Sequence, residues 1–128
     1  MQAFRGGLLA ASVTALLFTS AGATAAPPDP FVGVWTSVDA VDGSDQIVAF
    51  GGSGDTRRIT LRDTDATEAC ATGGPAVVRG TGTVVGDTLS GDLLVHCADG
   101  SPSFTVEVTF THSAGTLDDG FGTTWHRP

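Results

Sequence analysis

Three histidines, His96, His112 and His126, are the side chains of this sequence best suited to bind a transition metal. A zinc site needs several such ligands to converge, and no two of the three have the i,i+2 or HxxxH spacing that brings ligands together on one element. Each lies at the end or on the outward side of a segment expected to form a strand. We therefore expect solvated imidazoles, and the sequence predicts no metal site.

Ser53 is the serine closest to a nucleophile motif, because it lies in the glycine-rich run Gly51–Asp55. The G-x-S-x-G elbow of serine hydrolases is not matched, since Asp55 stands where the last glycine would be and a strand, not a helix, is expected to follow. No set of nucleophile, base and orienting residue can be assembled from the sequence. The chain is predicted to be a non-enzymatic protein that uses no cofactor.

Carboxylates cluster in two expected loops. Asp39, Asp42 and Asp45 surround a glycine-containing turn, where they could hold Ca²⁺, although their spacing departs from that of an EF-hand loop. Acidic turn residues also accept hydrogen bonds from their own backbone, which is the role expected of them. The second group, Asp63, Asp65 and Glu68, is interpreted as a solvated acidic face.

Arg57, Arg58 and Arg62 form the only local cluster of positive charge after residue 26. Arg58 and Arg62 fall on one face of an expected strand, because side chains two and four residues apart share a face. They could hold an anionic group together. The alternative, which the sequence favours, is that they balance nearby aspartates.

Cys70 and Cys97 are the two cysteines of the chain, and in an exported protein two cysteines most simply form one disulfide. Closing a loop of this size stabilises a fold by roughly 3.5 kcal/mol in the chain-entropy model. Two free thiols or a metal pair are the alternatives. His96 is adjacent to Cys97, but neighbouring side chains in a strand point to opposite faces.

Residues 1–26 are predicted to be a secretory signal peptide. Arg5 precedes the apolar run Leu8–Phe18, and the small residues Ala21–Ala26 offer cleavage sites after Ala25 or Ala26. The apolar run is too short for a membrane anchor. The mature protein is therefore expected to be secreted, into the extracellular space or a periplasm, with no membrane association.

Residues 27–128 are enough for one domain and carry a net charge of −9, with five arginines and no lysine against fourteen acidic residues. Nucleic acids and anionic membranes require a basic footprint on their protein partners. We therefore expect neither of these partners, and we expect a monomer.

The segment Ala76–Cys97 predicts a β-hairpin around the two-residue turn Gly86-Asp87, with glycine at the first central position as a type II′ turn requires. Apolar and polar residues alternate along both arms, so one face is expected to be buried and the other exposed to solvent. Three glycines, Gly80, Gly82 and Gly91, fall on the buried face. They allow a sharp bend or the close approach of another backbone.

Further strands are expected along the rest of the mature chain, and no segment has helical periodicity. Besides the hairpin, the expected strands are 31–37, 46–50, 57–63, 103–111, 116–118 and 121–127. The sequence therefore predicts an all-β domain, an up-and-down antiparallel eight-stranded barrel. The alternative is a two-sheet β-sandwich. The inward glycines favour the barrel, because closing a small sheet requires strong coiling.

Gly33-Val34-Trp35, on the first expected strand, resembles the G-x-W signature of the lipocalin and wider calycin barrels. In those families the tryptophan closes one end of the barrel and is packed by an arginine from near the last strand. The resemblance therefore implies that Gly33, Trp35 and Arg127 have a structural closure role, with a cation–π contact between the last two. The chain is much shorter than a typical lipocalin.

The mature chain is also similar to small secreted actinobacterial proteins of unknown function. Their tail has the pattern D-x-x-G-x-x-W-x-R, which Asp119, Gly122, Trp125 and Arg127 match here. This resemblance implies a fold and a secreted location, and it brings no ligand with it.

A barrel of this size either holds one small ligand or is filled by its own side chains, and the phenylalanine and tryptophan content favours a filled interior. The predicted function is binding of unknown specificity, and a small apolar ligand is the occupant expected of an interior that is left open. The candidate interior residues are Trp35, Phe50, Leu93, Phe104, Phe110 and Trp125.

The alternative function is a secreted interaction protein, such as an inhibitor of an exported protease. Calycin-like barrels with one disulfide have that role in some bacteria. The partner would then be another exported protein, met through the N-terminal arm at residues 27–31 or the loop at residues 64–75.

Overall fold

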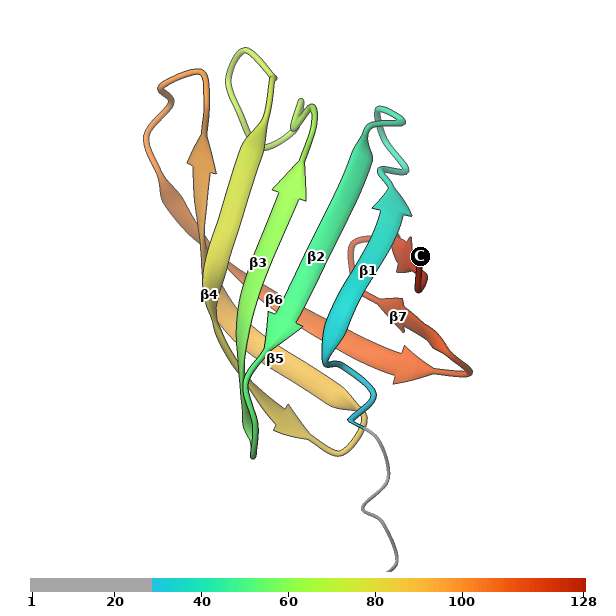
Figure 1. Ribbon diagram of the computed structural model, residues 1–128. Helices are drawn as coiled ribbons and strands as arrows, with labels where there is room; N and C mark the ends of the chain where they lie inside the picture. The colour runs from blue at the N-terminus through green and yellow to red at the C-terminus, as the bar shows by residue number, and fades with distance from the viewer. Residues whose placement is uncertain (1–28) are drawn as a thin grey trace, which may run out of the picture.

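The structure is a computed structural model, and it describes residues 29–128. Eight strands form one antiparallel sheet in which each strand pairs with the next along the chain (Figure 1). The predicted signal peptide, residues 1–26, lies outside the described residues. The strands are β1 (Gly33–Val38), β2 (Asp45–Gly51), β3 (Thr56–Asp63), β4 (Ala76–Val85), β5 (Thr88–Cys97), β6 (Phe104–Ser113), β7 (Thr116–Asp118) and β8 (Thr124–Trp125).

The sheet curls until its first and last strands meet. The backbone N–H of Thr36 in β1 donates to the carbonyl of His126 at 2.8 Å, and the N–H of His126 donates back at 2.9 Å. The Ser37 hydroxyl adds a bond to the carbonyl of Thr124 at 2.7 Å. The predicted all-β up-and-down barrel is thus confirmed, in preference to a two-sheet sandwich, and it is nearly closed. Within residues 29–128 no helix is long and apolar enough to cross a membrane.

The β4–β5 hairpin has the predicted register, with Val85 opposite Thr88. Gly86 has a φ of +61°, which the first central position of a type II′ turn requires. At the inward glycines the two backbones nearly touch. A Cβ on Gly91 would lie 2.5 Å from the carbonyl oxygen of Thr81, so the bend predicted from these glycines depends on their lack of a side chain.

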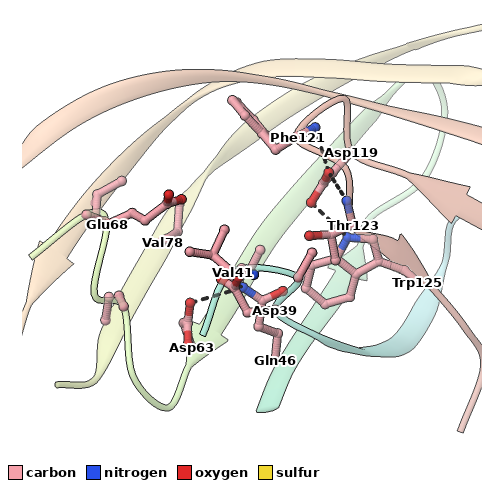
Figure 2. A pocket seen from close by; sticks show the side chains of 16 residues that line it. Asp39, Val41, Gln46, Asp63, Glu68, Val78, Asp119, Phe121, Thr123 and Trp125 are labelled. Carbon is pink, nitrogen blue, oxygen red and sulfur yellow. Dashed lines mark hydrogen bonds between the residues drawn. The ribbon is translucent and has the colours of Figure 1, made fainter. Parts of the chain in front are cut away.

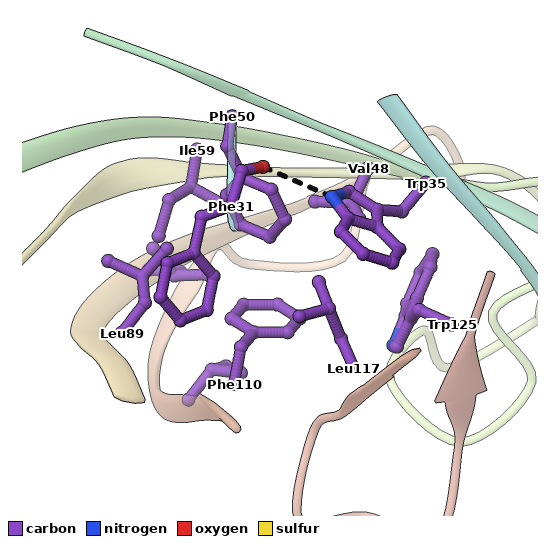
Figure 3. Close-up of a cluster of buried hydrophobic side chains, with 11 residues drawn as sticks. Phe31, Trp35, Val48, Phe50, Ile59, Leu89, Phe110, Leu117 and Trp125 are labelled. Carbon is purple, nitrogen blue, oxygen red and sulfur yellow. Dashed lines mark hydrogen bonds between the residues drawn. The ribbon is translucent and has the colours of Figure 1, made fainter. Parts of the chain in front are cut away.

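Aromatic and aliphatic side chains fill the middle of the barrel (Figure 3). Phe110 packs edge-to-face on Phe50, with ring centroids 5.0 Å apart, and Phe31 packs edge-to-face on the same ring at 6.3 Å. Such T-shaped pairs contribute stability beyond the area that they bury. The buried cluster consists of Phe31, Trp35, Val48, Phe50, Ile59, Leu89, Leu93, Val108, Phe110, Leu117 and Trp125.

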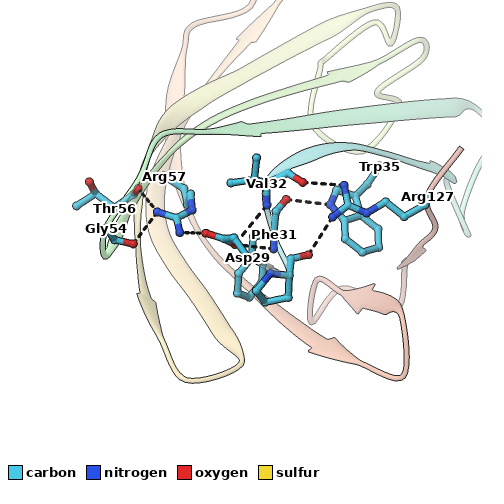
Figure 4. A network of polar contacts seen from close by, with 9 residues as sticks. Asp29, Phe31, Val32, Trp35, Gly54, Thr56, Arg57 and Arg127 are labelled. Carbon is cyan, nitrogen blue, oxygen red and sulfur yellow. Dashed lines mark hydrogen bonds and ion pairs between the residues drawn. The ribbon is translucent and has the colours of Figure 1, made fainter. Parts of the chain in front are cut away.

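One end of the barrel is covered by the segment that precedes β1 (Figure 4). Asp29 accepts a hydrogen bond from the backbone N–H of Phe31 at 2.8 Å and forms an ion pair with Arg57. The Arg57 guanidinium also donates to the carbonyls of Gly54 and Thr56, at 2.8 and 2.6 Å. The Arg57 side chain is only 5% exposed, so these partners offset the free-energy cost of removing its charge from water.

Arg127 covers Trp35 at the same end. Its guanidinium carbon lies 4.0 Å from the centre of the indole, and its nitrogens donate to the carbonyls of Val32 and Pro30 at 2.8 and 3.2 Å. Gly33 has a φ of +113°, and a Cβ there would lie 2.5 Å from the guanidinium. A glycine at this position therefore leaves the space that the arginine occupies.

The Cys70–Cys97 disulfide is present, with the two Cα atoms 5.7 Å apart. It joins the loop between β3 and β4 to the end of β5. Around it lies a small second cluster of buried residues, Ala66, Ala76 and Val95. The predicted pairing is therefore confirmed, and the longest loop of the domain is fixed to the sheet.

Three expectations about the strands and their ends are wrong. Phe31 precedes β1 instead of lying in it, and it is fully buried. The last strand is limited to Thr124–Trp125, and Phe121 lies in a loop with 63% of its surface exposed, because the glycines on both sides of it have positive φ and turn the chain. His112 is not simply solvated, since β6 extends past it and its ring packs edge-on to Trp35 at 6.2 Å.

Candidate ligand pocket at the open end of the barrel

The loops that follow odd-numbered strands meet at the end of the barrel opposite Asp29 and Arg57, because consecutive strands are antiparallel. At this open end the interior reaches the surface in a cavity of about 200 Å³ (Figure 2). The loops between β1 and β2, between β3 and β4, and between β7 and β8 all contribute to its lining. We call this cavity the mouth pocket.

Apolar side chains from four strands form the inner wall of the mouth pocket. Trp125, which is fully buried, borders the pocket from β8, and Leu61, Val78 and Val95 extend the wall across β3, β4 and β5. A dry cavity of about 150 Å³ is enough to bind benzene. The mouth pocket therefore has room for one ring or a short branched chain.

Four carboxylates also line the mouth pocket: Asp39, Asp63, Glu68 and Asp119. Asp63 and Asp119 are each only 8% exposed, so the solvated position expected of Asp63 is wrong. Among the described residues that line the pocket there is no lysine, arginine or histidine. The pocket therefore has a strongly negative electrostatic potential, and its charge is concentrated where water is partly excluded.

Gln46 positions two of these carboxylates. Its side-chain Nε2 donates to Asp39 and to Asp63, at 3.0 Å each, and the Ser44 hydroxyl donates to Asp63 at 2.7 Å. The Oε1 atom of Gln46 is buried and has no hydrogen-bond partner among residues 29–128. Because these donors are an amide and a hydroxyl, they orient the carboxylates without neutralising their charge.

Asp119 fixes the indole that forms the inner wall. Its carboxylate accepts hydrogen bonds from the backbone N–H groups of Phe121 and Thr123, at 2.8 and 3.3 Å, and from Nε1 of Trp125 at 3.2 Å (Figure 2). One buried carboxylate thus shapes the β7–β8 loop and orients the aromatic wall of the pocket.

Asp42 ties two loops together at the rim. It accepts a hydrogen bond from the Thr67 hydroxyl at 2.7 Å and one from the backbone N–H of Ser44 at 2.8 Å. Hydrogen bonds from Ser44 and Thr67 favour the ionised form and lower the pKa of Asp42 to about 2. The role expected of this turn aspartate, accepting bonds from its own backbone, is confirmed, and it also reaches a second loop.

Asp99 makes a second tie between rim loops. It accepts bonds from both the backbone N–H and the hydroxyl of Thr72, at 2.9 Å each, and from the N–H of Ser101 at 2.8 Å. Hydrogen bonds from Ser101 and Thr72 hold the pKa of Asp99 well below its usual range. Together with the disulfide, these ties fix the position of the β3–β4 loop.

The six candidate interior residues separate into three groups. Trp35, Phe50, Leu93 and Phe110 are at most 3% exposed and belong to the packed core. Phe104 lies at the edge of the barrel, 41% exposed. Trp125 lies between the core and the mouth pocket and is the member of the set that lines the cavity.

The two segments proposed as protein-docking elements are both engaged by the barrel. Residues 27 and 28 lie outside the described residues, and from Asp29 to Phe31 the chain is held by Arg57 and by burial of the phenylalanine. The loop at residues 64–75 is exposed in part and is fixed by the disulfide and the rim ties.

Among the described residues that line the mouth pocket there is no serine, cysteine or histidine. His96 Nδ1 lies 3.1 Å from the Ser103 hydroxyl on the exposed outer face, and within residues 29–128 no carboxylate is hydrogen-bonded to this imidazole. The described residues contain one compact group of potential metal ligands, Cys70, Cys97 and Asp99. Both of its sulfurs are in the disulfide, which removes the thiolates that a metal would bind.

Gln46 and Asp119 were not singled out as site residues from the sequence. Gln46 looks like an ordinary strand residue, and only the register Gln46–Asp63 between β2 and β3 brings it to a carboxylate. For Asp119, the spacing to Trp125 in the tail pattern was the available signal, since the two are joined by a hydrogen bond.

No protein-family model matches the chain, and neither a curated protein nor a solved structure matches it. The fold and the site therefore define its class: a small antiparallel β-barrel, covered at one end and with an acidic, aromatic-walled pocket at the other.

Proposed function

We propose that the protein is an exported binding protein whose mouth pocket holds a small molecule with an apolar body and a positive charge. The observation that carries this proposal is the composition of the pocket: a cavity of about 200 Å³ with an apolar wall, four carboxylates and no basic side chain. Apolar walls supply affinity in small-molecule sites, and a few placed polar groups supply orientation. Export is supported by the signal-peptide pattern and by the disulfide.

The positive charge on the ligand follows from electrostatics. Carboxylates that are partly removed from water attract a cation more strongly than exposed ones do, because the effective dielectric constant around them is lower. An anionic ligand of the same size would be repelled by Asp39, Asp63 and Asp119 together.

Binding is favoured over catalysis because the pocket contains carboxylates and an amide but no nucleophile paired with a base. Three of the four carboxylates accept hydrogen bonds from neutral donors, Gln46 or Trp125, which fix their positions and leave their charge. We infer a role in capturing or carrying a compact amine.

Native mass spectrometry of the protein purified from the culture medium of its own host is the first test. We expect a species with added mass that is lost on denaturation, and the released molecule should be an amine of a size that about 200 Å³ accommodates. A released acid or neutral lipid would contradict the proposed charge.

A matched series of probes tests the pocket directly. We expect 2-phenylethylammonium to bind residues 27–128 at least about tenfold more tightly than neutral 2-phenylethanol, with no binding of phenylacetate, measured by calorimetry and by amide NMR shifts. Val78→Phe, on the inward face, should abolish binding by filling the cavity. Its neighbour Val77, on the outward face, provides the control variant Val77→Phe, which should bind as the parent does.

Each of two results would overturn the proposal. Equal binding of all three probes would remove the role of the carboxylates. Unchanged binding in a folded Val78→Phe variant, with a thermal unfolding midpoint like that of the parent, would place the ligand elsewhere.

A further inference from the structure

The outer face of β3 and β4 gathers three exposed arginines, Arg58, Arg62 and Arg79, which we call the arginine face. Arg79 pairs across the strands with Thr60, so Arg58 and Arg62 lie diagonally on either side of it. Diagonal neighbours in an antiparallel pair are about 7–8 Å apart. The three guanidinium groups are therefore close enough to bind one ligand together.

None of these three arginines forms an ion pair or a side-chain hydrogen bond within residues 29–128. The aspartates that the sequence expected them to balance are therefore not in direct contact with these arginines. The two other arginines of the mature chain do have partners, Arg57 in its ion pair with Asp29 and Arg127 over Trp35. Every arginine without a structural contact in the described domain therefore lies on this one face.

Three like charges at neighbouring positions repel one another and lower the stability of the sheet. Asp92 on β5 and Asp45 on β2 are diagonal neighbours of Arg79 and Arg62 on this outer face, but neither forms an ion pair with them within residues 29–128. The arginine face thus forms no ion pair within the described domain, although two acidic residues lie beside it. This combination favours a partner outside the domain.

Apolar side chains flank the arginine face on both sides. Ile47 on β2 and Leu94 on β5 are 42% and 51% exposed, and Leu94 pairs directly with Arg79. Two shallow grooves, of about 360 and 440 Å³, run beside Arg79 and beside Arg62, and these apolar side chains contribute to their lining. The surface therefore offers positive charge at its centre and apolar contact at its edges.

We propose that the arginine face binds an extended, acidic segment of another exported polypeptide, with carboxylates at alternate positions and apolar residues beside them. In an extended chain, side chains on one face repeat about every 6.6–7 Å, which matches the spacing of the arginines. Guanidinium groups bind carboxylates with two parallel hydrogen bonds. The apolar edges favour a polypeptide over a glycan or polyphosphate, which would present no apolar side chains to them.

The net charge of the mature chain does not prevent this contact. At physiological ionic strength, charges on other faces are screened over about 8 Å, whereas the groups in direct contact are not. The arginine face also lies on the outside of the barrel wall, so this inference is independent of the mouth pocket.

The test uses residues 27–128, with the disulfide formed, and a capped synthetic peptide of sequence Leu-Thr-Asp-Thr-Asp-Thr-Leu. In the extended form its leucines and aspartates share one face. Amide and guanidinium NMR shifts are expected on β3 and β4 during the titration. The matched peptide with asparagine in place of both aspartates should not bind at the same concentrations.

The double variant Arg62→Gln/Arg79→Gln should weaken binding of the aspartate peptide by about tenfold or more. Ser113→Glu/Thr124→Glu lowers the net charge equally on exposed positions of other strands and should change binding by less than about twofold. Circular dichroism and the thermal unfolding midpoint establish that both variants are folded.

Three results would overturn the proposal. The two peptides could bind equally, which would exclude a role for the carboxylates. A heparin-derived oligosaccharide could shift β3 and β4 where the aspartate peptide does not, which would assign the face to a glycan. Sedimentation could show a dimer that Arg62→Gln/Arg79→Gln dissociates, which would make a second copy of this chain the occupant.

Discussion

Arg57 and Arg127 illustrate two ways in which a single guanidinium holds this small barrel together. Arg57 is buried, and its charge is compensated by Asp29 and two carbonyl groups. Arg127 stays at the surface and joins the end of the chain to its beginning, through the indole of Trp35 and two further carbonyls. Both arginines connect segments that are distant in sequence. Each does so at a place where no pair of strands joins those segments.

Replacement of Arg127 by alanine should lower the free energy of unfolding by about 1–2 kcal/mol, because it removes a cation–π contact and two charge-assisted hydrogen bonds at an exposed site. Denaturant titration with both fluorescence and circular dichroism measures this change. Arg79→Ala serves as the control, since that side chain has no partner in the described domain, and its effect should stay within about 0.5 kcal/mol. Equal effects of the two substitutions would contradict the closure role.

At the scale of the element, the bend in the β4–β5 hairpin depends on glycine. We expect Gly91→Ala to lower the free energy of unfolding by about 3 kcal/mol, because its Cβ would overlap the backbone of β4. The contact atom, the carbonyl oxygen of Thr81, cannot rotate away as a side chain could.

Gly51 provides the matched control, at the end of β2. A Cβ there meets nothing within 4 Å, and Gly51 is not among the glycines with positive φ. Gly51→Ala should therefore change stability by less than about 0.5 kcal/mol. If both alanine variants unfolded at the same denaturant concentration, the bend would not need glycine at position 91.

The strands could be predicted from sequence where local pattern and turn chemistry agree. Phe104, Val106, Val108 and Phe110 alternate with polar residues, and the glycine turn fixes the hairpin register. The last strand was overestimated because the alternation continues through Phe121, while the flanking glycines with positive φ turn the backbone away. Periodicity describes side chains and does not detect a change of backbone direction.

The candidate site was less predictable, because its parts meet only through tertiary structure. The mouth pocket combines Gln46 from β2, Asp63 from β3 and Asp119 from the β7–β8 loop. Each looks like an ordinary polar residue in its own segment. The arginine face was visible in part, as Arg58 and Arg62 on one strand, but Arg79 joins them only through the β3–β4 register.

At the scale of the whole molecule, the loops around the mouth pocket that Asp42 and Asp99 tie together should be the first part to unfold in acid. The pKa of Asp42 is about 2 in the folded protein against an ordinary value of 3.8, and that of Asp99 is also strongly lowered. The folded state therefore binds fewer protons than the unfolded state between these pH values. The stabilisation from both aspartates is complete above their ordinary pKa and is lost as the pH falls through the lowered values.

We therefore expect the thermal unfolding midpoint to decrease as the pH is lowered from about 4 to about 2. The rate of amide hydrogen exchange should rise first in the β1–β2 and β3–β4 loops. Asp42→Asn/Asp99→Asn should flatten this pH dependence. Asp55→Asn/Asp87→Asn is the control, because neither of those side chains accepts a hydrogen bond within residues 29–128. A control variant that flattened the profile equally would show that general charge, and not the two rim ties, sets the acid stability of the barrel.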